Sequence, residues 1–306
     1  MFNDYAENLT VKNVAIDCKN MVWSKSVYLI VANNQHGTNP CPVFDNVTIS
    51  NYNAERPHAL IENNTQLTAQ EGLNVDTDPG YSVKYVDGTY KVVANMVKVL
   101  NGDTEVGTYA TLAEAISAAT AGNTIQFLAD LTENVTISKN LTIDGAGKTY
   151  TGKMIVTSDK GTVNIKNVNF DGKGYNGYAI EARGVYYLTI EDCTAKNYGY
   201  GFLQNASGTV LTTVKNVTIT DMNYGVKVDY SNAVVLENVD ITAGVAALLN
   251  SNYGEKTITI KDSKLNILGT WTRNNTIKTT YSFEGANTVG EWVIDAAIDS
   301  FKLVTK

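Results

Sequence analysis

The sequence predicts an all-β protein whose short strands stack as the coils of a parallel β-helix. The first observation is a six-residue phrase (apolar, charged, Asn or Asp, apolar, polar, apolar) that recurs with small variations at residues 165–170, 190–195, 214–219, 236–241 and 260–265. The second is its spacing, because the central residues 167, 192, 216, 238 and 262 follow one another at steps of 25, 24, 22 and 24. A repeat of this length indicates a supersecondary unit.

The third observation is the alternation inside each unit. Two runs of period 2 flank an Asn or Asp, which tolerates the left-handed backbone of a sharp corner, and a further apolar run follows, as at residues 177–180. Such a unit cannot close a core alone, but coils stacked about 4.8 Å apart pair every strand with its neighbours. We also expect the corner Asn residues to form amide ladders along the axis. The sequence has neither the Leu-x-x-Leu-x-Leu frame of leucine-rich repeats nor crossover helices.

These phrases resemble those of the pectin-lyase-like right-handed parallel β-helix proteins, and in particular the repeat-bearing surface proteins of gut bacteria. The resemblance covers most of the chain and implies a right-handed solenoid with coils of 22 to 25 residues. It implies a fold and not an activity, because one fold carries many functions.

Composition narrows the classes of partner. The 306 residues carry a net charge of -7 and only three Arg, which leaves no basic face for phosphate groups. No run of eighteen apolar residues occurs in the sequence. We therefore expect neither nucleic-acid binding nor membrane insertion.

The start of the chain shows no export signal, because Met1–Asp4 lacks the basic and apolar regions of a signal peptide. Residues 1–66 nevertheless contain the coil phrase without a cap before it, at residues 11–16 and 44–49. We therefore expect an extracellular or cell-surface protein of bacteria whose export signal lies upstream in a longer reading frame. An intracellular protein is the alternative.

The three Cys are too few for a disulfide framework. Cys193 replaces an inward-facing Val of the repeat and is expected to be an inert, buried thiol. Cys18 and Cys41 lie 23 positions apart, about one coil, so stacking would bring them within bridging range. The alternative is that both are buried thiols.

Four segments are predicted along the chain. Residues 1–66 are interpreted as the terminal coils of a preceding module, residues 67–95 as a β-hairpin linker, residues 96–268 as a capped parallel β-helix, and residues 269–306 as C-terminal strands or a cap. The alternative places residues 1–66 on the main solenoid as extra coils. The linker assignment rests on Asp87-Gly88 between two alternating runs.

One short helix is predicted over residues 111–120. Thr111 and Glu114 form a capping-box pattern, and Gly122 suits the C-terminal cap. A helix placed directly before the first coil is expected to cover the open apolar end of the solenoid. A second hairpin is predicted just before it, at residues 97–106.

Enzymes of the resembling family cleave polysaccharides on an outer face of the solenoid. A polygalacturonase would need an acidic pair and an Arg-x-Lys element beside a His-Gly pair, and His36-Gly37 lies alone in a loop. A pectate lyase would use calcium and a Lys or Arg base. Aligning Ile180, Phe202, Val226 and Val245 as inward residues groups four outward charges for such chemistry, with Leu203 between them: Glu181, Arg183, Lys227 and Asp229.

In this grouping Lys227 or Arg183 would be the base, and Glu181 and Asp229 the calcium ligands. A solvated strand face with alternating charges is the alternative interpretation, and we expect no catalytic residue, metal or cofactor. A different feature is the alignment of Tyr178, Tyr200 and Tyr224 on successive coils. Stacked rings present apolar surface to a sugar while their hydroxyls hydrogen-bond, although such ladders also stiffen corners without a ligand.

The sequence thus favours a non-enzymatic extracellular stalk or adhesion module, with Tyr178, Tyr200 and Tyr224 as glycan-binding residues and a polysaccharide or cell-surface glycan as partner. The first alternative is a polysaccharide lyase or glycoside hydrolase of the same fold. The second is a phage tailspike-type protein.

Overall fold

The computed structural model of the chain describes residues 2–3, 10–19, 30–32, 43–52, 61–63, 72–77, 80–86, 89–157, 161–184, 186–204, 211–229, 233–250, 256–267, 270–273, 279–289, 292–294 and 303–305. The chain divides into two compact units, residues 1–95 and 96–306. Each unit has a hydrophobic core of its own.

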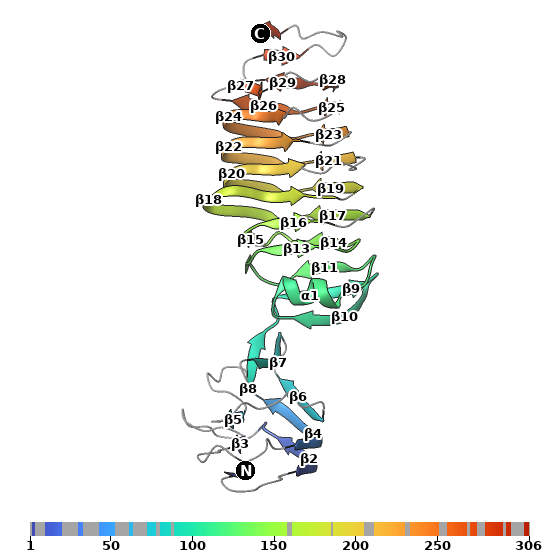
Figure 1. The fold of residues 1–306 in the computed structure, drawn as a ribbon, viewed down its shortest axis with the longest axis vertical. Helices are drawn as coiled ribbons and strands as arrows, with labels where there is room; N and C mark the ends of the chain where they lie inside the picture. The colour runs from blue at the N-terminus through green and yellow to red at the C-terminus, as the bar shows by residue number, and fades with distance from the viewer. Residues whose placement is uncertain are drawn as a thin grey trace. The chain divides into compact units, whose positions relative to one another are not determined.

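The second unit is a right-handed parallel β-helix, as the sequence predicts. Its coils follow one another as parallel rungs from β11 to β29 (Figure 1). One sheet has ten strands in the order β10 (Thr104–Tyr109), β9 (Val97–Asn101), β11 (Thr124–Phe127), β14 (Thr142–Asp144), β17 (Thr162–Lys166), β19 (Tyr187–Glu191), β21 (Leu211–Lys215), β23 (Ala233–Glu237), β25 (Lys256–Lys261) and β28 (Thr279–Glu284).

The other sheet has thirteen strands and holds the long β18, β20, β22 and β24, which bend around a corner of the coil. Its members are β12 (Leu131–Thr132), β13 (Val135–Ile137), β15 (Thr149–Thr151), β16 (Met154–Val156), β18 (Asn169–Ala182), β20 (Thr194–Gln204), β22 (Thr218–Val228), β24 (Asp240–Asn250), β26 (Lys264–Ile267), β27 (Thr270–Arg273), β29 (Asn287–Val289), β30 (Trp292–Ile294) and β31 (Leu303–Thr305).

Like residues stack on like residues in the core. The first apolar residue of each phrase lies in register with its equivalents above and below, from Ile143 through Ile165, Ile190 and Val214 to Leu236. All are fully buried. Each coil thus covers the apolar surface of the next, whereas an isolated coil would leave that surface exposed to water.

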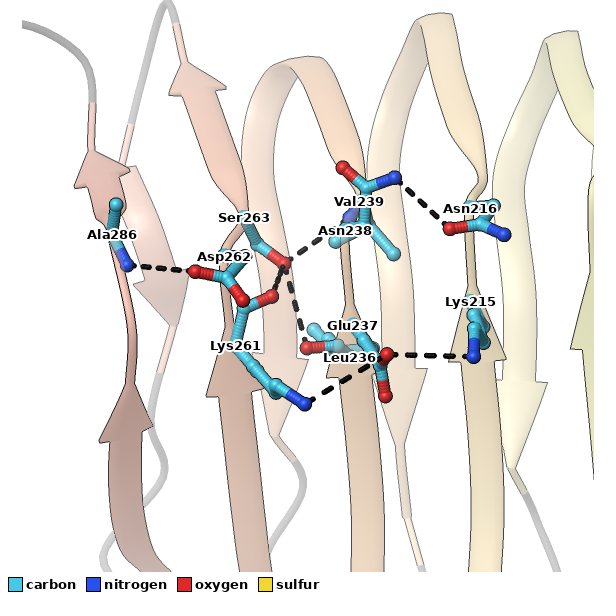
Figure 2. Close-up of polar contacts among 10 residues, drawn as sticks. All are labelled: Lys215, Asn216, Leu236, Glu237, Asn238, Val239, Lys261, Asp262, Ser263 and Ala286. Carbon is cyan, nitrogen blue, oxygen red and sulfur yellow. Dashed lines mark hydrogen bonds and ion pairs between the residues drawn. The ribbon is translucent and has the colours of Figure 1, made fainter.

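The Asn or Asp in the centre of each phrase has a left-handed backbone, as predicted. The φ angles of the five central residues lie between 49° and 54°. Side chains of successive corners are linked along the axis, since Asn216 donates to Asp192 (2.9 Å) and Asn238 donates to Asn216 (2.9 Å) (Figure 2). Asn167 donates instead to Asp144 (3.0 Å), which pairs with Lys166 and is not a corner residue. The predicted amide ladder is confirmed in part, as the Asn238–Asn216 pair that ends on the carboxylate of Asp192.

A row of alternating charges runs beside these corners, at the last residue of the seven strands from β14 to β28 in the ten-stranded sheet. Strand pairing places its members in register: Asp144, Lys166, Glu191, Lys215, Glu237, Lys261 and Glu284. Glu237 lies 3.4 Å from Lys215 and 3.9 Å from Lys261 (Figure 2). This charge row was not predicted from the sequence.

Within the described ranges the one helix is α1 (Leu112–Ala118), which packs against β9, β10, β11 and β13. The first half of the capping box is confirmed, because the Glu114 amide donates to Thr111 Oγ1 (3.1 Å). The Glu114 carboxylate accepts from the Ala110 amide (3.3 Å), one residue before the cap. Glu133 accepts from the first helical amides, at Leu112 and Ala113.

The C-terminal end of α1 differs from the prediction. The cap is Ala119 and not Gly122, which lies in the following turn with φ of 89°. Lys139 takes the role expected of the glycine, because its Nζ donates to three of the last carbonyls, at distances between 2.7 and 2.9 Å, on Ile116, Ser117 and Ala119. A lysine ammonium at this end also suits the helix dipole.

The first unit contains β1 (Phe2–Asn3), β2 (Thr10–Asp17), β3 (Ile30–Ala32), β4 (Val43–Tyr52), β5 (Ile61–Asn63), β6 (Leu73–Thr77), β7 (Tyr81–Val86) and β8 (Thr89–Ala94). The strands β2, β4 and β6 pair in parallel as coils do, and Asn13 and Asn46 have left-handed backbones at their corners. Both predicted hairpins are confirmed, as β7 with β8 and β9 with β10. Cys18 is buried, and its proposed partner Cys41 lies outside the described residues.

Parallel pairing continues past residue 268, where regular coils were predicted to end. β27 pairs with β24, β28 with β25 and β29 with β26, which makes one further coil. The corner of this coil is Gly285, with φ of 69°. Glycine adopts the left-handed backbone without a side chain, so the coil lacks the Asn or Asp that marks the others in the sequence.

Candidate functional site

The predicted tyrosine ladder forms on the outer side of β18, β20 and β22. Strand pairing places Tyr178 opposite Tyr200, and Tyr200 opposite Tyr224. Their ring centroids are 4.5 and 4.8 Å apart, close to the spacing of the coils, and the rings of Tyr200 and Tyr224 lie within 8° of parallel. All three are half-buried. The predicted stacking is confirmed, whereas sugar binding by these rings stays a prediction.

The four predicted charged residues follow the ladder in the sequence, three and five residues after Tyr178 and after Tyr224. Glu181 pairs with Leu203, which pairs with Lys227, so the two charged coils are separated by one coil as expected. The alignment of the fourth coil was wrong: Val226 pairs with Leu248 and not with Val245, and Lys227 therefore lies opposite Leu249. The predicted alignment matched Gly244 with Gly225, because each precedes a valine. In the structure Ala247 lies opposite Gly225, three positions after Gly244.

Glu181 lies at the centre of an ion-pair cluster. Arg183 donates to both of its carboxylate oxygens, from Nε at 2.7 Å and from Nη2 at 3.0 Å, and Lys153 of the preceding coil forms a second ion pair. The Glu181 side chain is only 5% exposed, whereas that of Arg183 is 49% exposed. Burial alone would raise the pKa of Glu181, but hydrogen bonds from Arg183 and Lys153 outweigh it and lower the pKa.

Lys227 and Asp229 form a second ion pair, with 3.0 Å between Nζ and Oδ2. Lys227 Nζ also lies 6.0 Å from the centroid of the Tyr178 ring, at one end of the tyrosine ladder. Burial alone would lower the pKa of Lys227, but the hydrogen bond and charge of Asp229 outweigh it and raise the pKa. Burial raises the pKa of the Tyr178 hydroxyl, against the opposing effect of Lys227.

This arrangement argues against proton abstraction by either candidate base. A general base must be neutral when it acts, and the ion pairs raise the pKa of both Lys227 and Arg183. The expectation of a solvated face is also not met, because Glu181 and Asp229 are buried. Among the described residues, no group of three His, Cys, Asp or Glu side chains is placed to hold a metal ion.

One member of the cluster was missed in the sequence, namely Lys153. Ile155 pairs with Glu181, so Lys153 lies on the preceding coil, two positions before the partner of that glutamate. Extending the two predicted outward rows by one coil leads to Ile155 and Thr157, so the alignment alone would not have identified Lys153. The other candidate region, the loop of His36, lies outside the described residues.

Comparison with known proteins supports the architecture. Residues 153–295 match the family model described as "Right handed beta helix region". No curated protein and no solved structure matches the chain. Within the described part of the chain, no helix is long and apolar enough to cross a membrane.

Proposed function

We propose that the chain is a non-enzymatic β-helix module of an extracellular bacterial surface protein, and that it contacts glycans through Tyr178, Tyr200 and Tyr224. The observation that carries the proposal is the stack of three half-exposed rings on consecutive coils. Because neighbouring rings stack on one another, the ladder presents ring edges and hydroxyls outward, and a ring face is open only at its ends. Sugars offer both apolar C–H groups and hydroxyl groups, so they suit such a surface.

The charges beside the ladder support a binding role over a catalytic one. Glu181 is neutralised by Lys153 and Arg183, and Lys227 by Asp229. The raised pKa of Lys227 keeps the ammonium protonated at neutral pH, which suits a hydrogen-bond donor and not a base. A lyase or hydrolase of the same fold is the alternative that the experiment must separate.

The test compares glycan binding by the wild-type chain and two tyrosine variants on a glycan array, followed by titration with the bound glycans. We expect Tyr200→Ala, at the centre of the ladder, to weaken binding by about 3- to 10-fold, because one aromatic contact contributes about 0.5–1.5 kcal/mol. Tyr187→Ala is the matched control, since Tyr187 is 47% exposed on the other sheet and outside the ladder. Equal losses in both variants, or no binding to any glycan, would contradict the contact surface.

A second measurement addresses the enzymatic alternative. The chain is incubated with acidic and neutral polysaccharides, with and without calcium, and unsaturated products and reducing ends are followed. We expect no turnover. Turnover that is lost in Lys227→Ala or Arg183→Ala would overturn the non-enzymatic proposal.

A further inference from the structure

A groove of about 430 Å³ lies on the outer surface of the thirteen-stranded sheet, on the face between the first and second corners of the coil. It crosses β15, β18, β20 and β22 at the start of each strand. The tyrosine ladder lies on the same long strands but beyond the second corner, where Asn197 and Asp221 have left-handed backbones. The groove is therefore a second surface, separate from the ladder.

A row of polar side chains, most of them threonine hydroxyls, lines the groove with one residue on each successive coil. Strand pairing aligns Thr149 with Asn169, Asn169 with Thr194, and Thr194 with Thr218. Four stacked strands at about 4.8 Å each give a row about 14 Å long. Thr194 and Thr218 are exposed. A ligand lying along this row meets a polar group at every coil.

Some of these groups are held in place by the protein itself. Asn169 donates to the Gly147 carbonyl (2.7 Å) and accepts from the Thr194 hydroxyl (2.9 Å). A threonine hydroxyl that donates to the protein still accepts from a ligand. The orientation of these side chains is thus set before a ligand binds, which reduces the entropy cost of binding.

The charge of the groove is balanced. Its second row contains Asp171, which pairs in register with Lys196, and the two charged groups lie 3.7 Å apart. Hydrogen bonds from Asn197 and from the Lys173 amide hold the pKa of Asp171 below its usual range, so the carboxylate stays ionised. The Asp171 carboxylate would repel an anionic ligand, and the Lys196 ammonium would repel a cationic one. A neutral ligand meets a donor and an acceptor side by side.

We infer that this groove binds a neutral oligosaccharide that lies along the solenoid axis. A neutral sugar chain carries hydroxyls that both donate and accept, it has no net charge, and its length suits an open row of threonines. The groove volume falls within the range of about 300–1,000 Å³ that is usual for ligand sites. The inference rests on the proposed glycan-binding function and adds the ligand class and a second site.

The experiment titrates the full chain by calorimetry with cellohexaose, mannohexaose and xylohexaose, and with hexagalacturonate as the acidic counterpart. We expect at least one neutral hexasaccharide to bind. Thr218→Val removes one hydroxyl and keeps the branched shape, and it should weaken that binding by roughly 5-fold, the equivalent of one hydrogen bond. Lys196→Met should weaken it by a similar or larger factor.

Matched controls come from the other sheet of the same coils. Thr213→Val on β21 and Lys215→Met at its end change the same residue types outside the groove and should leave binding unchanged. Thermal unfolding followed by circular dichroism establishes that all variants are folded. A groove variant that unfolds is replaced by Thr220→Val, which removes another lining hydroxyl.

The outcomes separate the groove from the tyrosine ladder. Binding that falls in Thr218→Val and not in Thr213→Val supports the groove. Binding that falls only in Tyr200→Ala overturns the groove and leaves the proposed function intact. Binding of hexagalacturonate alone, or of none of the four probes, overturns the inference of a neutral ligand.

Discussion

The corner residue of a coil has two roles. It adopts the left-handed backbone of the corner, and its side chain forms hydrogen bonds with the neighbouring coils. Asn216 has φ of 53°, a backbone that ordinary L-residues adopt only at a cost. Its side chain donates to Asp192 and accepts from Asn238. An ionised Asp lacks a donor, so Asp192 and Asp262 receive a hydrogen bond from the next coil and have none to give to the previous one.

The two roles of Asn216 are separable by substitution. Asn216→Gly removes both side-chain hydrogen bonds and keeps an accessible left-handed backbone, whereas Asn216→Ala removes the same bonds and adds backbone strain. We expect the alanine variant to be less stable than the glycine variant by about 1–2 kcal/mol, the cost of a left-handed backbone for an L-residue. Urea unfolding followed by circular dichroism measures the difference. Equal stability of the two variants would show that only the hydrogen bonds matter.

At the scale of the element, the charge row beside the corners selects the register of the strands. The period of a strand is two, so a slip by one residue turns the whole set of side chains to the wrong face, and a slip by two still leaves the apolar pattern intact. The charge row opposes such a slip, because it would remove Glu237 from its place between Lys215 and Lys261. Each exposed pair contributes little alone, but the row repeats over seven strands.

Reversing one charge tests this interpretation. Glu237→Lys places three ammonium groups on adjacent strands, and we expect it to lower stability by about 1 kcal/mol relative to Glu237→Gln, since like charges directly opposite one another repel. High salt should reduce the difference, because it screens exposed charges. Urea unfolding of both variants at low and high salt provides the measurement. A difference that salt does not change would assign the loss to packing instead of charge.

At the scale of the whole molecule, the sequence predicted what is local and repeated. The phrase recurs in every regular coil, and the capping box of Thr111 and Glu114 lies within four residues, so both were visible without a structure. The fourth-coil alignment failed because Ala247 replaces a glycine, and the last coil was missed because Gly285 replaces an Asn.

The candidate site was less accessible to sequence analysis for a physical reason. The order of the tyrosines and charges along the strands was predicted, because register follows from the repeat. Burial was not, since Glu181 is covered through ion pairs with Arg183 on its own coil and Lys153 on the preceding one. Likewise the groove exists only when four coils are stacked, so no single coil displays it.

The cap at the start of the solenoid is expected to decide whether the second unit is soluble alone. β9, β10 and α1 cover the edge of β11 and the first core residues, Ile125 and Phe127, which are almost fully buried. We expect residues 96–306 to fold as a monomer, because this cap and a separate core belong to that unit. Residues 123–306, which lack the cap, expose a strand edge and apolar side chains, and should aggregate.

Size-exclusion chromatography with light scattering, together with circular dichroism, compares the two chains. A point variant within the longer chain removes the ambiguity of a deletion: Leu112→Asp places a charge on the buried face of α1, where Leu112 has no exposed surface, and should promote association as the deletion does. Ala113→Asp, on the exposed side of the first turn, is the matched control and should stay monomeric. A monomeric, equally stable chain of residues 123–306 would contradict a protective role for the cap, and would mean that the edge of β11 is tolerated in water.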